Sequence, residues 1–274
     1  DEWISVISKA NNSKNTIKLG IVGKYVELQD SYLSVKESLI HAGISNNTEI
    51  QIEWINSEEI SSNNINDIFN DIKGIIVPGG FDKRGTQGMI DACRYARENN
   101  IPYFGLCLGM QIMVIEAARN LLGYQDSNST EFDETTPFPV IDLMPEQLKS
   151  LHKGGSMRLG LYECNLADST YTKKIYKQNN IKERHRHRYE VNNKYVEELK
   201  NIGLIPSGVH PEGDLVEIME YNNHPFMIGV QFHPEFLSTP LSPHPLFVEF
   251  VKSAMNNNNF QSNKIINEKE SKIT

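Results

Sequence analysis

Short apolar runs alternate with amphipathic segments along the first half of the chain. Four segments have the apolar or alternating pattern of strands: 17–22, 49–55, 74–78 and 103–106. Three segments carry apolar residues at helical spacing: 31–43, 88–99 and 108–122. This alternation predicts an α/β fold with a mainly parallel central sheet flanked by helices on both faces.

The second half of the chain has a looser pattern. Prolines and glycines between residues 123 and 160 predict long loops, and a closing helix is expected from about Pro245. Short strand-like segments predict an additional, smaller strand-rich part; they lie at 160–166, 189–191, 215–221 and 227–232. The polar, Asn-rich residues 1–15 are interpreted as a linker, residues 16–253 as one domain, and residues 254–274 as a disordered polar tail.

Composition narrows the class of protein further. The 274 residues are 39% hydrophobic and 23% charged, as in ordinary soluble globular proteins. A formal net charge of -8 argues against a general nucleic-acid binder, and no apolar run approaches the roughly 20 residues that span a bilayer. Three cysteines and an N-terminus without signal-peptide features favour a reducing, cytoplasmic location.

The segment Gly105-Leu106-Cys107-Leu108-Gly109 joins a predicted buried strand to an apolar helix. A G-x-C-x-G sequence at such a junction predicts a nucleophile elbow, in which the glycines permit a tight turn and the central side chain projects at the helix start. The helix dipole there favours a thiolate. A buried packing cysteine is the simpler reading of Cys107 alone, but the elbow context favours a nucleophile.

A second motif, Gln231-Phe232-His233-Pro234-Glu235, follows the last predicted strand. His233 can carry protons for a cysteine nucleophile, and Glu235 can orient its imidazole from the same side of the strand end. The backbone N–H of Leu108, together with that of Gly80 or Phe81 in a Pro-Gly-Gly-Phe turn, can stabilise an oxyanion. The two motifs together predict a Cys-His-Glu triad that cleaves an amide.

The motifs PGGF, FGLCLGMQ and QFHPEF, in this order, resemble the class I (triad) glutamine amidotransferases, which have a flavodoxin-like fold. Longer stretches resemble the glutaminase half of the CTP synthase family: GKYVELQDSYLSVKESLIHAG, FDKRGTQGM, ERHRHRYEVNN and QFHPEFLSTPLSPHPLF. The resemblance covers nearly everything but the tail. It implies that the chain hydrolyses L-glutamine to glutamate and ammonia through a γ-glutamyl thioester on Cys107.

The resemblance also implies roles for further residues. Glu131 would bind the α-ammonium group of glutamine, and Arg188 would lie beside its α-carboxylate. The rest of the substrate pocket would be formed by Gly80, Phe81, Leu108, Gly109, Met110 and Gln111. Arg84, Gly85 and Gln87 would belong to a mobile lid linked to GTP, the allosteric activator. An acid is common in the family where Gln87 stands, which puts any charge-dependent lid contact in doubt.

CTP synthases also carry an N-terminal amidoligase domain, and this sequence contains no Walker-type phosphate-binding motif. Mg²⁺ and ATP are therefore expected only in that absent domain, which would use the ammonia to convert UTP into CTP. No metal site is predicted here. The resemblance implies that the full-length enzyme is a homotetramer and that its amidoligase domain is the partner of this one.

Several alternatives remain open at this point. The chain can be the glutaminase domain of another triad amidotransferase, such as one that makes GMP or carbamoyl phosphate, or a free γ-glutamyl hydrolase. It can also serve mainly in assembly or regulation, with little activity in isolation. The basic run at 184–188 is more simply a solvated or ion-paired segment than a nucleic-acid or zinc site, and Cys93 and Cys164 are interpreted as packing thiols.

Overall fold

The computed structural model describes residues 1–13, 15–143, 157–212 and 214–257. Its main feature is a nine-stranded mixed sheet with the order β2-β1-β3-β4-β12-β11-β10-β7-β8. The first five of these strands run parallel, and antiparallel pairing extends the sheet from β12 to β8. The strands are β1 (Asn15–Gly23), β2 (Thr48–Asn56), β3 (Gly74–Val77), β4 (Tyr103–Leu106), β7 (Arg158–Leu166), β8 (Asn180–His187), β10 (Leu204–Val209), β11 (Val216–Tyr221) and β12 (Met227–Val230).

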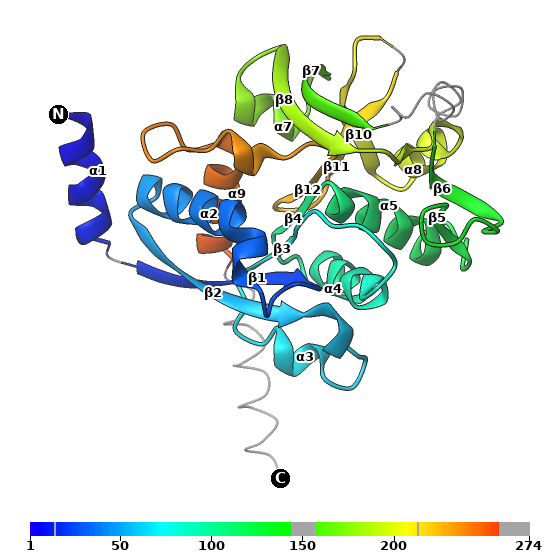
Figure 1. Cartoon of the computed structure of the whole chain (residues 1–274), viewed down its shortest axis with the longest axis horizontal. Helices are drawn as coiled ribbons and strands as arrows, with labels where there is room; N and C mark the ends of the chain where they lie inside the picture. Colours follow the sequence, from blue (N-terminus) through cyan, green and yellow to red (C-terminus); the bar gives the residue numbers. More distant parts are fainter. Residues whose placement is uncertain (14, 144–156, 213, 258–274) are drawn as a thin grey trace.

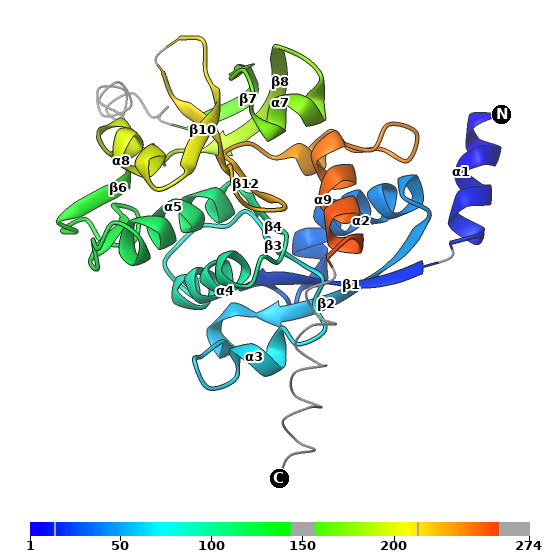
Figure 2. The same cartoon turned by 180° about the vertical axis from the view of Figure 1, so that it is seen from behind.

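Helices cover both faces of the parallel part of this sheet (Figures 1 and 2). One face packs against α4 and α5, and the other against α2 and α9, so the sheet lies between two hydrophobic clusters. The helices are α1 (Glu2–Asn11), α2 (Leu33–Ser45), α3 (Ile65–Ile68), α4 (Thr86–Glu98), α5 (Leu108–Asn120), α7 (Tyr171–Tyr176), α8 (Val196–Asn201) and α9 (Pro245–Met255).

Short 3₁₀ turns complete the described part of the chain: η1 (Gln29–Tyr32), η2 (Ser57–Glu59), η4 (Asn193–Tyr195) and η5 (Pro234–Phe236). None of the described helices is long and apolar enough to cross a lipid bilayer.

The central α/β architecture confirms the predicted fold class, including the strand-rich part. β3 and β4 are fully buried runs, as expected for strands with helices on both faces. The carboxyl ends of β3, β4 and β12 meet at one edge of the sheet, because the three strands are parallel neighbours. Functional side chains that follow these strands are therefore brought together there.

One local expectation was wrong. The expected loops between 123 and 160 contain strands β5 (Ser127–Ser129) and β6 (Phe138–Asp142), which form a small sheet with β9 (Glu190–Val191). Residues 2–11, within the segment interpreted as a linker, form helix α1, and none of its side chains is buried. Helix α9 ends at Met255, and most of the predicted tail, residues 258–274, lies outside the described residues.

Candidate active site

Cys107 lies at the sharp turn between β4 and α5, where the chain adopts a φ of 50°. The flanking glycines are required by close packing. A Cβ atom at Gly105 would lie 2.5 Å from the backbone of Gly109, and one at Gly109 would lie 2.1 Å from the carbonyl oxygen of Val77. The backbone N–H of Cys107 donates to the carbonyl of Val230 at 2.7 Å, which ties the turn to β12. The geometry is that of the predicted nucleophile elbow.

His233 and Glu235 follow β12 and lie beside this elbow. Nδ1 of His233 donates a hydrogen bond to Oε1 of Glu235 at 2.7 Å, and both side chains are buried. The backbone N–H of His233 donates to the carbonyl of Arg184 at 2.8 Å, and the ring of Phe236 stacks on the imidazole at 5.2 Å between centroids. These contacts fix the imidazole with its Nε2 edge free of any hydrogen bond to a described residue.

The imidazole of His233 and the side chain of Cys107 both lie close to Gly79. A Cβ atom at Gly79 would lie 2.8 Å from Cε1 of His233 and 3.6 Å from Cβ of Cys107. Burial alone would lower the pKa of His233, but the neighbouring Cys107 sulfur and the Glu235 carboxylate outweigh it and raise this pKa far above its usual value. The imidazolium form is thus favoured beside the sulfur.

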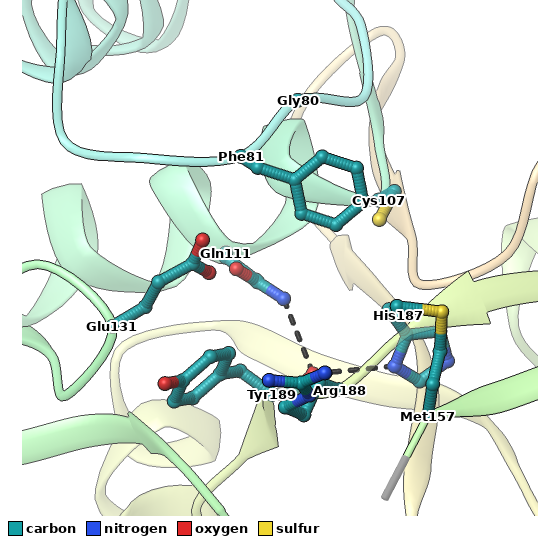
Figure 3. A pocket seen from close by; sticks show the side chains of 9 residues that line it. All are labelled: Gly80, Phe81, Cys107, Gln111, Glu131, Met157, His187, Arg188 and Tyr189. Carbon is teal, nitrogen blue, oxygen red and sulfur yellow. Dashed lines mark hydrogen bonds between the residues drawn. The ribbon is translucent and has the colours of Figure 1, made fainter. Parts of the chain in front are cut away.

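A cavity of about 140 Å³ opens on one side of Cys107 (Figure 3). Glu131 lies across the cavity from Cys107, and Gln111 and Arg188 project into the space between them. Oε1 of Glu131 accepts a hydrogen bond from the backbone N–H of Asp82 at 3.0 Å. The complete lining is Gly80, Phe81, Cys107, Gln111, Glu131, Met157, His187, Arg188 and Tyr189. A carboxylate, a guanidinium and a cysteine around one small cavity fit an amino acid with an amide side chain.

Three members of the predicted pocket, Leu108, Gly109 and Met110, are not among the residues that line this cavity. Gly109 packs against the carbonyl of Val77, and Met110 packs against Gly229 in the sheet. Leu108 contributes the first backbone N–H of α5, and its side chain faces Gly80: a Cβ atom at Gly80 would lie 3.1 Å from Cδ2 of Leu108. Gly80 and the start of α5 are therefore neighbours, as an oxyanion site made by their N–H groups requires.

A second cavity of about 490 Å³ lies on the other side of the triad. It shares Cys107, Gly80 and Phe81 with the first cavity and also reaches His233 and Glu235. Its outer wall carries aromatic and basic side chains, namely Tyr25, Tyr32, Phe236 and Arg186.

The predicted lid residues lie beside this second cavity rather than in a single loop. Arg84 pairs with Glu58 at 2.9 Å and donates to the backbone carbonyl of Lys24 at 3.1 Å. Gly85 has a φ of 69° and precedes α4, whereas Gln87 belongs to the first turn of α4. The amide of Gln87 donates to Asp91 at 3.1 Å and accepts from Arg119 at 3.2 Å, so it points away from Cys107.

The wall behind the first cavity contains a buried ionic network. Arg158 donates to Glu190 at 3.2 Å and to Glu217 at 2.7 Å, and Nδ1 of His185 lies 2.8 Å from Nε2 of His187. Burial lowers the pKa of both histidines, and it raises the pKa of Glu190 to about 8. Within the described residues, His185, His187 and Glu217 have the spacing of metal ligands, but the Arg158 guanidinium already supplies positive charge to this group.

Sequence reasoning gave no role to Gln231, although its motif was recognised. Its amide Nε2 donates to the sulfur of Cys107 at 3.6 Å. The signal was the spacing: residues 231 and 233 at a strand end project to the same side, so both reach the nucleophile. Gly79 was also given no role of its own, because its proximity to His233 depends on two strands far apart in the chain.

The fold and this constellation define a class of protein. The family model for class-I glutamine amidotransferases matches residues 27–253, and the chain belongs to that family. Within the family it groups with the glutaminase domains of CTP synthases. The glutaminase domain of Trypanosoma brucei CTPS, solved with bound acivicin, superimposes with a TM-score of 0.83 and 38% identity, covering 88% of this chain and 95% of that one.

Two curated relatives are also CTP synthases. CTP synthase from Flavobacterium johnsoniae is 52% identical over 254 residues, which are 93% of this chain and 47% of the relative. CTP synthase from Clostridium perfringens is 51% identical over 256 residues, 93% of this chain and 48% of the relative. The chain therefore spans about half the length of the curated relatives that it matches.

Proposed function

We propose that Cys107, His233 and Glu235 are the catalytic triad with which this glutaminase domain hydrolyses L-glutamine. The observation that carries the proposal is the placement of an elbow cysteine in the lining of the first cavity with a carboxylate-bound imidazole beside it. A sulfur anion can attack the carbon of an amide, and an imidazolium beside it can protonate the leaving nitrogen.

The reaction follows from these positions. The sulfur of Cys107 attacks the side-chain amide carbon, and the N–H groups of Leu108 and Gly80 stabilise the oxyanion. His233 then donates its proton to the departing ammonia, which leaves a γ-glutamyl thioester. Neutral His233 next removes a proton from water, the resulting hydroxide displaces the sulfur, and glutamate is released. Glu235 keeps the imidazole oriented through both steps.

The first cavity is the proposed seat of glutamine. Glu131 would pair with the α-ammonium group and Arg188 with the α-carboxylate, while the side-chain amide reaches Cys107. Glu131 lies on the side of the cavity away from the sulfur, and Arg188 projects into the space between them. Gln111, Gly80 and Phe81 complete the walls. A seat for a free α-ammonium group favours glutamine over the residues of folate polyglutamates, whose α-nitrogen is acylated and carries no charge.

The activity of the longer relatives is also part of the proposal. Ammonia would pass to an N-terminal amidoligase domain, which uses ATP and Mg²⁺ to convert UTP into CTP in a cytoplasmic homotetramer. GTP would activate hydrolysis from the second cavity, where aromatic rings can stack on a purine and Arg186 can meet a phosphate.

An exposed apolar and basic surface next to the triad fits this partner domain. The outer face of β7 and β8 pairs Leu159 with Arg186 and Leu161 with Arg184, and both leucines are exposed. Phe236, which follows Glu235, is exposed beside them. In a full-length protein, Leu159→Ser should lower glutamine-dependent CTP formation and leave glutamine hydrolysis intact. Equal loss of both activities would contradict docking at this surface.

Labelling with a diazo-ketone analogue of glutamine tests the nucleophile. We expect intact-mass and peptide analysis to find one adduct on Cys107, with Cys93 and Cys164 unmodified because both are fully buried. Cys107→Ala should abolish both labelling and the release of ammonia from glutamine. A wild-type chain that takes up no label and releases no ammonia would instead favour a domain for assembly or regulation.

A further inference from the structure

Gln231 lies between the end of β12 and the catalytic histidine. Its side chain is fully buried, and its backbone N–H donates to the carbonyl of Glu217 at 2.8 Å. Its amide Nε2 donates to the sulfur of Cys107 at 3.6 Å. That distance is normal for sulfur, which is a larger acceptor than oxygen. The nucleophile therefore has a neutral donor in contact, in addition to the neighbouring imidazole of His233.

The side-chain amide of Gln111 fixes the orientation of the Gln231 amide. Nε2 of Gln111 donates to Oε1 of Gln231 at 3.3 Å and to the backbone carbonyl of Tyr189 at 3.2 Å (Figure 3 shows the latter bond). A flipped Gln231 amide would place two N–H₂ groups against each other and turn an acceptor toward the sulfur. The observed arrangement therefore directs the amide nitrogen of Gln231 toward the sulfur of Cys107.

We propose that Gln231 is a positioning residue that stabilises the sulfur anion of Cys107 and holds it in the direction of attack. Hydrogen bonds to a charged acceptor are stronger than neutral ones, so the amide favours the anion over the thiol. The proposal rests on the proposed function, because it matters only if Cys107 is the nucleophile.

The same chain of amides connects the nucleophile with the substrate wall. Tyr189 directly follows Arg188, and its carbonyl also lies 3.3 Å from Nδ1 of His187. A glutamine molecule held by Arg188 therefore rests on a segment whose backbone is bonded, through Gln111 and Gln231, to the attacking sulfur. One set of hydrogen bonds therefore positions both the substrate-binding segment at Arg188 and the sulfur of Cys107.

A purely structural role for Gln231 is the competing explanation, since any buried amide needs partners. The two explanations differ in what happens to the sulfur. Loss of a structural amide weakens folding or the pocket, but it does not change the pH at which Cys107 becomes reactive. Loss of a donor to the anion moves that pH upward.

The test is the rate of Cys107 alkylation by iodoacetamide, followed as a function of pH in the whole chain by peptide mass analysis. Gln231→Met, similar in size but without a donor, should raise the midpoint of this curve by about one pH unit. Gln111→Met should raise it less, because it only frees the Gln231 amide to rotate. Gln51→Met, at an exposed position of β2, is the matched control and should leave the midpoint unchanged.

Glutamine hydrolysis gives a second readout. Gln231→Met should lose about tenfold in rate at a pH below the wild-type alkylation midpoint and recover that loss above its own raised midpoint. Folded Gln231→Met and Gln111→Met chains with wild-type alkylation midpoints would overturn the proposal. A wild-type chain that is alkylated at Cys107 but does not hydrolyse glutamine would contradict the proposed function instead, because alkylation involves no glutamine.

Discussion

Nδ1 of His233 donates to Oε1 of Glu235 at 2.7 Å, and only the rigid Pro234 separates the two residues in the chain. This bond sets the tautomer of the imidazole: with Nδ1 protonated, Nε2 is the atom that faces Cys107 and exchanges protons. The carboxylate also adds to the electrostatic attraction that keeps the imidazolium protonated inside a buried site.

We therefore expect Glu235→Gln to change the pH profile of glutamine hydrolysis. The pKa of His233 is raised to about 11, so the imidazolium is present at neutral pH and its proton is lost only as the pH rises through that raised value. Removal of the carboxylate charge lowers this pKa and should move the alkaline limb of kcat/KM down by about one to two pH units. Steady-state rates of ammonia release, followed from pH 6 to about pH 12, measure this shift.

Glu197→Gln is the matched control for that experiment, because Glu197 is an exposed residue of α8 that pairs with the nearby Lys200. Its pH profile should superimpose on that of the wild type. An alkaline limb that stays in place in Glu235→Gln would show that the carboxylate orients the ring without shifting its charge.

Gly79→Ala should inactivate the site while the fold persists. The added methyl group would lie 2.8 Å from Cε1 of His233, so the imidazole must move away from Cys107. Misplacement by a fraction of an ångström to 1 Å costs on the order of tenfold to a hundredfold in rate. We expect such a loss of kcat with glutamine, measured beside the thermal unfolding midpoint.

Gly123→Ala separates this effect from general damage. Gly123 has a φ of 79° and open space around its Cα, so the substitution strains the backbone far from the triad. It should lower the unfolding midpoint and leave kcat unchanged. If Gly79→Ala behaves in the same way, the steric argument is wrong.

The parts of this protein that sequence reasoning could predict are those fixed by local pattern. Apolar runs bounded by glycine gave β3 and β4. Gly105 and Gly109 indicated the elbow, since a side chain at Gly105 would meet the backbone of Gly109 and one at Gly109 would meet Val77. The convergence of Cys107 with His233 followed from parallel strands, whose carboxyl ends share one edge.

The parts that were missed depend on contacts rather than pattern. β5 consists of three polar residues, Ser127–Ser129, and is a strand only because β6 pairs with it. Helix α1 is an exception: Trp3, Ile4 and Ile7 lie at helical spacing, but they are exposed, and the helix buries no side chain. The bond from Gln231 to the Cys107 sulfur needs two glutamine amides from α5 and β12 in register, which no single segment encodes.

Arg188→Met should raise the KM for glutamine by about a hundredfold with a smaller effect on kcat, because a charge-assisted pair with the α-carboxylate contributes to binding of substrate and transition state alike. Arg184→Met is the control: Arg184 is equally exposed, lies four residues earlier and faces the outside of β8. A KM that rises in both variants, or in neither, would remove Arg188 from the substrate site.

The strained backbone of Cys107 gives a prediction about stability. A φ of 50° with a ψ of -99° is costly for any residue with a Cβ atom, by about 1 to 3 kcal/mol, and glycine avoids that cost. Cys107→Gly should therefore be more stable than Cys107→Ala by about 1 kcal/mol or more, although both lack activity. Urea unfolding of the two variants measures the difference.

Cys93 supplies the opposite control, because it is a buried residue within helix α4 and has ordinary helical geometry. There Cys93→Gly should be less stable than Cys93→Ala by about 1 kcal/mol, the usual helical preference. If the Gly variant is more stable than the Ala variant at Cys107 but not at Cys93, the backbone conformation that projects the Cys107 sulfur lowers the free energy of unfolding of this protein. The same order at both cysteines would mean that the elbow is not strained and that its glycines serve only to pack α5 against the sheet.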